Sequence, residues 1–329
     1  MPTRAETHAA HARFGNRGNP QPAPSRKSAI VIIGGGIGNL VEQSPLILAV
    51  QSLYHTVDVW CPISKLAWVA LLQDIPGIRS WFVRPTQPQD MYDAAFGVFL
   101  TGPYLSKTHC RQTYLGGHFE RTKVSETETC MLAARAAGFQ GESPLPVCAS
   151  RTYAAALPAA PLIGIAAGGI VKPPWKLKRY PHYAQLVASM QAELPNVSFV
   201  NLGTQQDDAV SHPAVHDLRG RTTLLEVADI FTHCQLVVAN DCGLGHIAAA
   251  MGTPTYSLFG PTRTGKNTPY RNATAVTIAG LACQPCQYTR SGIGRKPPHG
   301  IRCKQECLQQ LDPQPLATSL VKVIQDAYA

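Results

Sequence analysis

Short apolar runs alternate with helical patterns along most of the chain, and this alternation constrains the fold more than any other feature. The β-branched run from Ala29 to Ile33 ends in glycines, as a buried parallel strand does, and a similar run spans 162–166. Each run begins its own series of strands and helices. Because parallel strands joined by helices form doubly wound sheets, the pattern predicts an α/β protein with two such sheets facing a central cleft.

The patterns also predict where the elements lie. In the first series we expect strands at 57–61, 80–83 and 94–100, and helices at 64–73 and 121–137. Ser44 and Pro45 are typical of a helix start, so a further helix is expected from there to about Tyr54. The second series predicts, in order, strand 162–166, helix 181–193, strand 197–202, helix 223–233, strand 236–239, helix 245–251 and strand 254–259.

A Pro/Ala-rich stretch from 143 to 161 separates the two series and predicts an interdomain linker. The expected domains are a disordered basic leader (1–28), an acceptor-side Rossmann-like domain (29–150), a linker (151–161), a nucleotide-sugar-binding Rossmann-like domain (162–312) with a cysteine-containing loop (283–307), and a closing helix (313–329).

Charge favours an anionic partner, since 29 Lys and Arg against 20 Asp and Glu leave a net charge of +9. Little aromatic interleaving and no binding motif argue against nucleic acid. Ten irregularly spaced cysteines favour a reducing compartment. The first 28 residues lack the apolar core of a secretory signal, and prolines and glycines break the longest apolar run, 154–171. We expect a cytoplasmic protein with, at most, peripheral membrane contact.

The glycine-rich loop Gly34–Asn39 follows the first strand and lets a ligand approach the backbone at Gly36 and Gly38. The dinucleotide fingerprint is met only in part, because Val41 stands where a third small residue belongs, although Asp58 lies twenty residues after Gly38. An NAD-dependent oxidoreductase therefore remains an alternative. A tight turn without a ligand is the other.

The segment Leu236–Gly252 is a buried strand that runs directly into a helix of small residues. Asp241 ends the strand, at the edge where open α/β sheets bind ligands. The main-chain N–H groups of Cys242, Gly243 and Leu244 would begin the helix and form a phosphate site, which His246 reaches one turn later. Asp241 as a simple N-cap and His246 as a structural histidine are the alternatives.

Asn240–Gly252, followed by Ser257–Thr262, resembles the signature of glycosyltransferase family nine, the ADP-heptose:lipopolysaccharide heptosyltransferases. Residues 33–50 and 175–181 resemble the family's glycine-rich loop and its basic-aromatic-proline motif. The resemblance implies a GT-B-type fold and inverting transfer that needs no cofactor or catalytic metal. The implied donor is ADP-heptose, and the implied acceptor is a lipopolysaccharide core or related anionic glycan. An autotransporter-type protein O-heptosyltransferase is the leading alternative.

The resemblance also implies roles for single residues. The donor's phosphates would meet a basic residue and a helix N-terminus, matched here by Lys178, Arg179, Cys242, Gly243, Leu244 and His246. Thr262 would lie near the pyrophosphate or the sugar. Asp207 or Asp208 matches the region that supplies an acid to the ribose, and Asp241 matches the acid that contacts the donor sugar's hydroxyl groups.

The expected catalytic base departs from the family pattern. Inverting transfer needs a base on the acceptor hydroxyl, and in the family this is an Asp directly after the loop glycine. Asn39 stands at that position, and an amide cannot take a proton at neutral pH. Glu42, three residues on, is the predicted replacement. The alternatives are that Asn39 only orients the acceptor, or that the protein has lost or changed its transfer activity. A dipole-favoured acid near a helix start is the alternative for Glu42.

Four cysteines form a second group, Cys283-x-x-Cys286 and Cys303-x-x-x-Cys307. Thiolates at such spacing suit structural Zn or Fe, and the resemblance points the same way, because the autotransporter branch of the family carries an iron-binding cysteine finger. A disulfide or free thiols are the alternatives. The stretch 263–304 carries eight Lys or Arg and no acid, so it is expected to face an anionic donor, acceptor or membrane surface.

Overall fold

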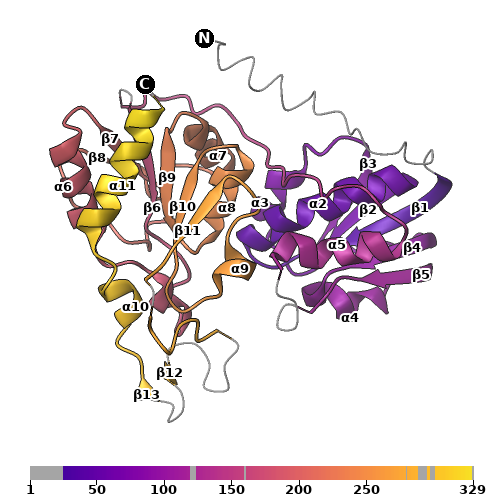
Figure 1. The fold of residues 1–329 in the computed structure, drawn as a ribbon. Coiled ribbons are helices and arrows are strands. Elements are labelled where there is room, and N and C mark those ends of the chain that lie inside the picture. The colour runs from indigo at the N-terminus through magenta and orange to yellow at the C-terminus, as the bar shows by residue number, and fades with distance from the viewer. Residues whose placement is uncertain are drawn as a thin grey trace.

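The computed structural model describes residues 25–118, 124–158, 161–278, 280–287, 295–296 and 301–327. Two parallel sheets form two α/β units that lie side by side (Figure 1). The predicted two-sheet α/β architecture is therefore confirmed. No helix among these residues is long and apolar enough to span a bilayer.

The N-terminal unit has the strand order β3-β2-β1-β4-β5. Its elements are β1 (Ser25–Ile32), α2 (Ile37–Leu53), β2 (Tyr54–Cys61), α3 (Leu66–Val69), η1 (Ala70–Leu72), β3 (Ile78–Val83), β4 (Tyr92–Gly97), η2 (Phe99–Thr101), α4 (Gly102–Leu105), β5 (Cys110–Leu115) and α5 (Glu126–Ala136). Apolar side chains of β1, α2 and α5 pack into one buried core.

Helix α2 begins at Ile37, seven residues before the start predicted from Ser44 and Pro45. A proline inside a helix leaves the carbonyl four residues earlier without its donor. Here the Ser44 hydroxyl donates a hydrogen bond to the Val41 carbonyl at 2.7 Å. Because the hydroxyl replaces the missing N–H, the helix continues through Pro45 and extends back to the glycine-rich loop.

The C-terminal unit has the strand order β11-β10-β9-β6-β7-β8. Its elements are β6 (Leu162–Ala166), η3 (Trp175–Lys178), α6 (Tyr183–Glu193), β7 (Ser198–Asn201), β8 (Val215–Asp217), α7 (Leu224–Thr232), β9 (Leu236–Asn240), α8 (Gly243–Ala250), β10 (Thr255–Leu258), α9 (Thr264–Asn267), β11 (Ala273–Val276), β12 (Arg295–Lys296), β13 (Ile301–Arg302), α10 (Glu306–Gln309) and α11 (Pro313–Asp326). Helix α11 packs against α6 in this unit.

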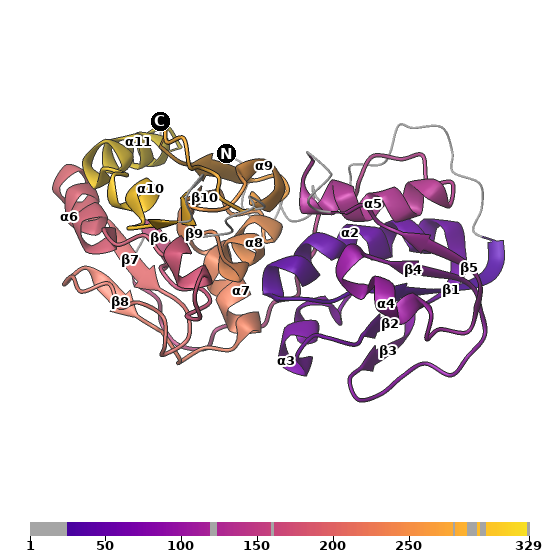
Figure 2. The ribbon, with the colours of Figure 1, turned by 90° about the horizontal axis from the view of Figure 1, so that it is seen from below.

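The two units meet through the N-terminal ends of α2 and α8, which Figure 2 shows facing each other. Val41 and Leu71 of the N-terminal unit belong to the same buried cluster as Val227 and Ile247 of the C-terminal unit. The junction is therefore a shared apolar core, and the carboxyl ends of both sheets open beside it.

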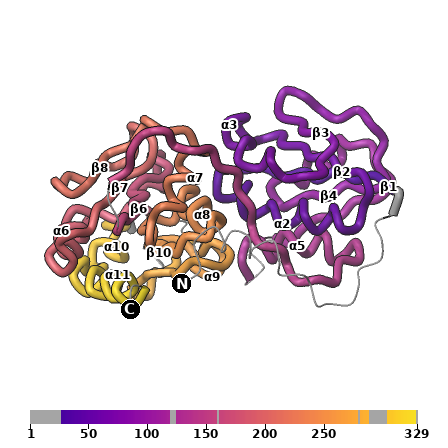
Figure 3. The backbone as a smooth tube through the Cα atoms, turned by 90° about the horizontal axis from the view of Figure 1, so that it is seen from above, coloured from indigo at the N-terminus to yellow at the C-terminus, as the bar shows by residue number. Residues whose placement is uncertain are grey.

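The chain crosses from one unit to the other near residue 150, where the tube in Figure 3 runs along the junction. Val147 N–H donates to the Ser44 hydroxyl at 2.9 Å, and Ala149 N–H donates to the Leu71 carbonyl at 2.7 Å. Arg151 N–H already donates to the Leu225 carbonyl of the other unit, at 3.0 Å.

Several element predictions need correction. Strand β1 starts at Ser25, inside the segment predicted to be a leader, while residues 1–24 lie outside the described residues. The helix predicted from 121 starts at Glu126, where the Ser125 hydroxyl accepts a hydrogen bond from Glu128 N–H. Strands β5, β8 and β11 were not predicted, since they lie toward the edges of the sheets and lack long β-branched runs.

Candidate functional site

Asp241 is the centre of a polar cluster at the carboxyl end of β9. Its carboxylate pairs with Lys178 Nζ at 2.9 Å and accepts hydrogen bonds from Thr262 Oγ1 and from Asn267 Nδ2, the latter at 3.3 Å. Burial opposes ionisation, but the Lys178 charge and these hydrogen bonds outweigh it and lower the pKa of Asp241. Three residues predicted for the donor site, Lys178, Asp241 and Thr262, are thus in contact.

Asn240 positions this cluster. Its side-chain amide donates to the Ala167 and Gly168 carbonyls at 2.6 and 2.9 Å, and its carbonyl oxygen accepts from Tyr180 N–H at 2.9 Å. These bonds join the end of β9 to the loop after β6 and to the turn that carries Lys178. The Lys178 ammonium also lies 5.6 Å from the centre of the Trp175 ring. Lys178 is therefore held against the sheet edge rather than free in solvent.

The start of α8 lies at the junction of the two units. Gly245 N–H donates a hydrogen bond to the Cys242 carbonyl at 3.2 Å, and burial raises the pKa of the Cys242 thiol. A Cβ atom on Gly243 would lie 2.7 Å from the Ile37 side chain. The predicted phosphate-binding N–H groups thus have a neighbour from the N-terminal unit.

His246 and Glu42 form an ion pair between the units. His246 Nδ1 lies 2.8 Å from Glu42 Oε1, which also accepts a hydrogen bond from Tyr270 N–H at 3.1 Å. Burial opposes protonation of His246, but the Glu42 hydrogen bond and charge outweigh it and raise the pKa of the imidazole. A Cβ atom on Gly38 would lie 2.6 Å from the His246 ring, so this glycine permits the close approach.

These contacts disfavour Glu42 as the catalytic base. The residue is 1% exposed, and its other carboxylate oxygen accepts from the Thr127 hydroxyl. His246 and Tyr270 N–H occupy one carboxylate oxygen and Thr127 occupies the other, so one acceptor position remains for an acceptor hydroxyl. The role as base stays a prediction, while the observed contacts make Glu42 a bridge between the units.

A second acid lies beside Asn39, the residue predicted to orient the acceptor. Glu126 Oε1 accepts a hydrogen bond from Asn39 Nδ2 at 2.5 Å, and Glu126 Oε2 pairs with Lys266 Nζ at 3.2 Å. Asn39 Oδ1 accepts from Gly36 N–H at 2.9 Å, which fixes the amide orientation. Lys266 Nζ also donates to Asn267 Oδ1 at 3.0 Å. Polar contacts therefore run from the glycine-rich loop to the Asp241 cluster.

Arg179 and Asp207 form an ion pair with each other, and contacts within the protein occupy both side chains. Arg179 pairs with Asp207 and Asp208, each at 2.9 Å, and also donates to the Gly169 carbonyl. Asp207 accepts N–H hydrogen bonds from Gly169 and Thr204 at 3.0 and 2.7 Å. The predicted phosphate and ribose roles of this pair stay predictions, and the observed contacts tie the loops after β6 and β7 together.

A cavity of about 270 Å³ lies next to this pair. Apolar and polar side chains share its lining, which consists of Val171, Lys176, Leu177, Arg179, Asp208 and Gln305. These residues follow β6 and β7 or precede α10, so the cavity opens at the carboxyl edge of the second sheet. That edge is where doubly wound sheets bind nucleotides.

The ribose-binding role considered for Asp58 is wrong. Asp58 lies inside β2 and is 0% exposed. Its carboxylate accepts hydrogen bonds from Arg79 Nε at 3.0 Å and from the Tyr92 hydroxyl at 2.7 Å. A carboxylate buried in these contacts cannot reach a ribose, which removes the main support for an NAD-dependent oxidoreductase.

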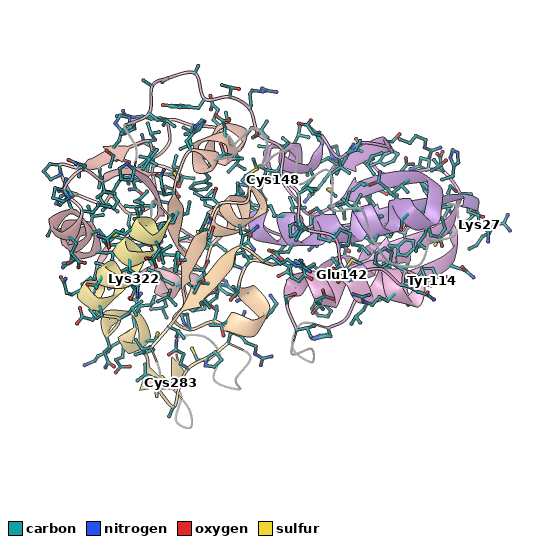
Figure 4. All side chains as sticks on the ribbon, turned by 45° about the horizontal axis from the view of Figure 1, so that its top comes forward. Lys27, Tyr114, Glu142, Cys148, Cys283 and Lys322 are labelled. Carbon is teal, nitrogen blue, oxygen red and sulfur yellow. The ribbon has the colours of Figure 1, made fainter. Side chains whose placement is uncertain are left out.

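None of the four predicted metal ligands is in a disulfide. Burial, together with the nearby thiols of Cys303, Cys286 and Cys283, raises the pKa of Cys307 to about 12, so the other three thiols lie near that of Cys307. Gln305 N–H donates to Cys303 Sγ at 3.0 Å, a contact that suits a metal-bound thiolate. As placed, no three His, Cys, Asp or Glu side chains in the described part of the chain form a metal site. Figure 4 shows Cys283 at the outer end of the C-terminal unit, away from the junction marked by Cys148.

Sequence reasoning missed Glu126, Lys266, Asn267 and Asn240. Glu126 lies far along the chain from Asn39, and only the packing of α5 against α2 brings them together. Lys266 and Asn267 follow Thr262 closely, so the basic stretch around them was a usable signal. Asn240 directly precedes Asp241 at the end of the buried strand. An amide at that position was a second usable signal.

Known proteins resemble this chain in sequence. Lipooligosaccharide heptosyltransferase 2 of Haemophilus influenzae is 29% identical over 201 residues, which cover 58% of this chain and 48% of that protein. Lipopolysaccharide heptosyltransferase 1 of Pseudomonas aeruginosa is 35% identical over 105 residues, 30% of each chain. The chain thus spans about half or less of the length of the curated relatives it matches.

Solved structures share the fold. E. coli ADP-heptose lipopolysaccharide heptosyltransferase II aligns with a TM-score of 0.62 and 18% identity, over 92% of this chain and all of the other. The iron-containing dodecameric heptosyltransferase TibC of enterotoxigenic E. coli, in complex with ADP-D-beta-D-heptose, aligns with a TM-score of 0.66 and 16% identity, over 92% of this chain and 78% of the other. These alignments confirm the predicted GT-B-type fold.

The sequence profile of glycosyltransferase family 9 (heptosyltransferase) matches residues 121–295. The match covers more than half of the chain and includes the segment with Asp241, His246 and Thr262. Together with the curated relatives and the shared fold, it confirms the resemblance noted in the sequence: this chain belongs to glycosyltransferase family 9.

Proposed function

We propose that this protein is an inverting glycosyltransferase that moves the sugar of ADP-heptose to a lipopolysaccharide core or related anionic glycan. The observation that carries the proposal is the contact of Lys178 and Thr262 with Asp241 at the carboxyl end of β9. A cation, a hydroxyl and an acid at one sheet edge match the three parts of a nucleotide-diphospho-sugar: its phosphates, the oxygen that bridges them to the sugar, and the sugar hydroxyls.

The donor is expected to redistribute the contacts of this cluster. Lys178 and Thr262 would turn from Asp241 to the diphosphate, helped by N–H groups at the start of α8. Asp241 would then accept hydrogen bonds from sugar hydroxyls. The cavity beside Arg179 and Gln305 is of a size and lining that suit the nucleoside. The chain's positive charge further supports anionic substrates.

The experiment compares ligands and then products. Calorimetry with ADP, UDP and NAD tests the nucleotide, and we expect selective binding of ADP. Incubation with ADP-heptose and a heptose-deficient core glycolipid, followed by mass spectrometry, should show a product that is heavier by one heptosyl group. Tight binding of NAD alone would overturn the proposal.

A protein acceptor is the second candidate, and the cysteine group favours it. Cys283, Cys286 and Cys303 lie near Cys307 and none of the four is in a disulfide, and we propose that they hold structural iron or zinc. The metal would order the loop between them and take no part in transfer. Mass spectrometry after incubation with an autotransporter passenger protein separates this acceptor from a glycolipid. Membrane contact through the basic stretch 263–304, at the cytoplasmic face, belongs to the same proposal.

A further inference from the structure

Glu126 lies at the carboxyl edge of the first sheet, next to the glycine-rich loop. Glu126 stands in the first turn of α5, 5% exposed, with one carboxylate oxygen on the Asn39 amide and the other on Lys266. Asn39 itself is half-buried in the first turn of α2, and Gly35, Gly36 and Gly38 beside it are also partly exposed. The Glu126 carboxylate therefore lies directly behind the part of this edge that an acceptor approaches.

Inverting transfer requires that a proton leave the acceptor hydroxyl as the new bond forms. Asn39 cannot take that proton. Glu42 already accepts hydrogen bonds from His246, Tyr270 and Thr127. Glu126 accepts only two side-chain donors among the described contacts, which leaves each oxygen a further acceptor position.

We propose that Glu126 is the general base of the transfer reaction and that Asn39 is the residue that positions it. This inference rests on the proposed function. In the step, the acceptor O–H proton moves to a Glu126 oxygen while the acceptor oxygen bonds to the anomeric carbon. The bond from that carbon to the β-phosphate oxygen breaks, and its electron pair leaves with ADP. Glu126 then returns the proton to solvent.

Contacts across the junction support the placement. Lys266 Nζ bonds both Glu126 and Asn267 Oδ1, and Asn267 Nδ2 bonds the Asp241 carboxylate. Asp241 is the acid proposed to hold the donor sugar. Two side chains of α9, Lys266 and Asn267, thus connect the base to the donor-binding acid. This connection would set the base at a fixed distance from the sugar it serves.

The first test is Glu126→Gln, which keeps the shape and removes the base. A positioned base contributes about 10²–10⁴-fold, so kcat should fall by that order while the Kd for ADP stays unchanged. The acidic limb of the pH–kcat profile should also disappear, which a purely structural role would not cause. Glu128→Gln, two residues on in the same helix, is the matched control and should keep the wild-type kcat.

The second test moves the carboxylate across the hydrogen bond. In the double variant Asn39→Asp/Glu126→Gln the amide and the acid exchange places, and the bond between residues 39 and 126 can form with its direction reversed. Recovery of at least about tenfold in kcat over Glu126→Gln is expected, since a base is again present at this edge. Thermal unfolding of each variant shows that a lost activity is not a lost fold.

The possible outcomes distinguish a failure of the proposed function from a failure of the proposed base. Wild-type protein that transfers no sugar from ADP-heptose would overturn the proposed function and this inference with it. Active wild type with an equally active, folded Glu126→Gln variant would overturn the inference alone. A Glu42→Gln variant that loses the acidic limb while Glu126→Gln keeps it would assign the base to Glu42 instead.

Discussion

The two sheet edges that meet at the junction neutralise their acids in different ways. At the edge of the C-terminal sheet, Asp241 is paired with Lys178 and Thr262 of its own unit. At the edge of the N-terminal sheet, Glu42 and Glu126 are paired with His246 and Lys266 of the other unit. The first edge can thus form within one unit, whereas the acids of the second depend on the contact between the two.

The largest expected effect concerns the self-contained edge. Lys178→Met removes the cation proposed to hold the diphosphate, and a charge-assisted hydrogen bond is worth about 1.5–3 kcal/mol, or about ten- to hundredfold in Kd. Calorimetry with ADP measures the loss. Lys172→Met, on an exposed residue before the same turn, is the control. An unchanged Kd for ADP would remove Lys178 from the donor site.

The dependence of the other edge on the contact between units is tested at Gly38. In Gly38→Ala the new Cβ would lie 2.6 Å from the His246 ring. Overpacking of this kind costs about 1–3 kcal/mol, which should lower the free energy of unfolding in urea. Gly36→Ala is the matched control, since its Cβ meets only Asn39 Oδ1, at 3.5 Å. Equal free energies of unfolding for Gly38→Ala and Gly36→Ala would mean that moving the units apart at Gly38 costs no stability.

The Glu42–His246 pair predicts how stability depends on pH. The folded protein raises the pKa of His246 above its ordinary value of 6.5. The contribution of the Glu42–His246 pair to the free energy of unfolding is therefore fully present below pH 6.5. It is lost as the pH rises through the raised pKa of His246.

Glu42→Gln removes the charge that raises this pKa, so the dependence on pH should flatten. Urea unfolding from about pH 5 to about pH 9 measures both curves. Wild type and variant with parallel curves would show that the pair does not couple protonation to folding. Asp241 and Glu126 also act on His246, so their own variants should change the curve less than Glu42→Gln does.

The smallest effect on transfer is expected at the cysteines, which lie away from both edges. Purified protein should contain about one Fe or Zn per chain by elemental analysis, and Cys303→Ser should lose it with little change in kcat. Cys148→Ser, at the junction, should keep the metal. Metal-free wild type with four freely alkylated thiols would contradict the metal proposal.

The difference between the two sheet edges also explains which site residues could be predicted from the sequence. Lys178, Asp241 and Thr262 follow strands or turns of one sheet, so local patterns and the family signature indicated all three. Glu126 meets Asn39 only because α5 packs on α2, and Lys266 reaches Glu126 only because the units dock. Asp58 had the expected spacing, but a neighbouring strand supplied Arg79 as its partner. Long-range packing carries no local signal, and these residues depend on it.

The path of the chain between the units has a mechanical consequence. Val147 and Ala149 are hydrogen bonded to the N-terminal unit and Arg151 to the C-terminal unit, with a single residue, Ser150, between the last two anchors. The serine that lets α2 pass through Pro45 is the first of these anchors. With these hydrogen bonds intact, a rotation of one unit against the other would have to be accommodated by the backbone torsions around Ser150. So short a connection limits how far one unit can slide along the other.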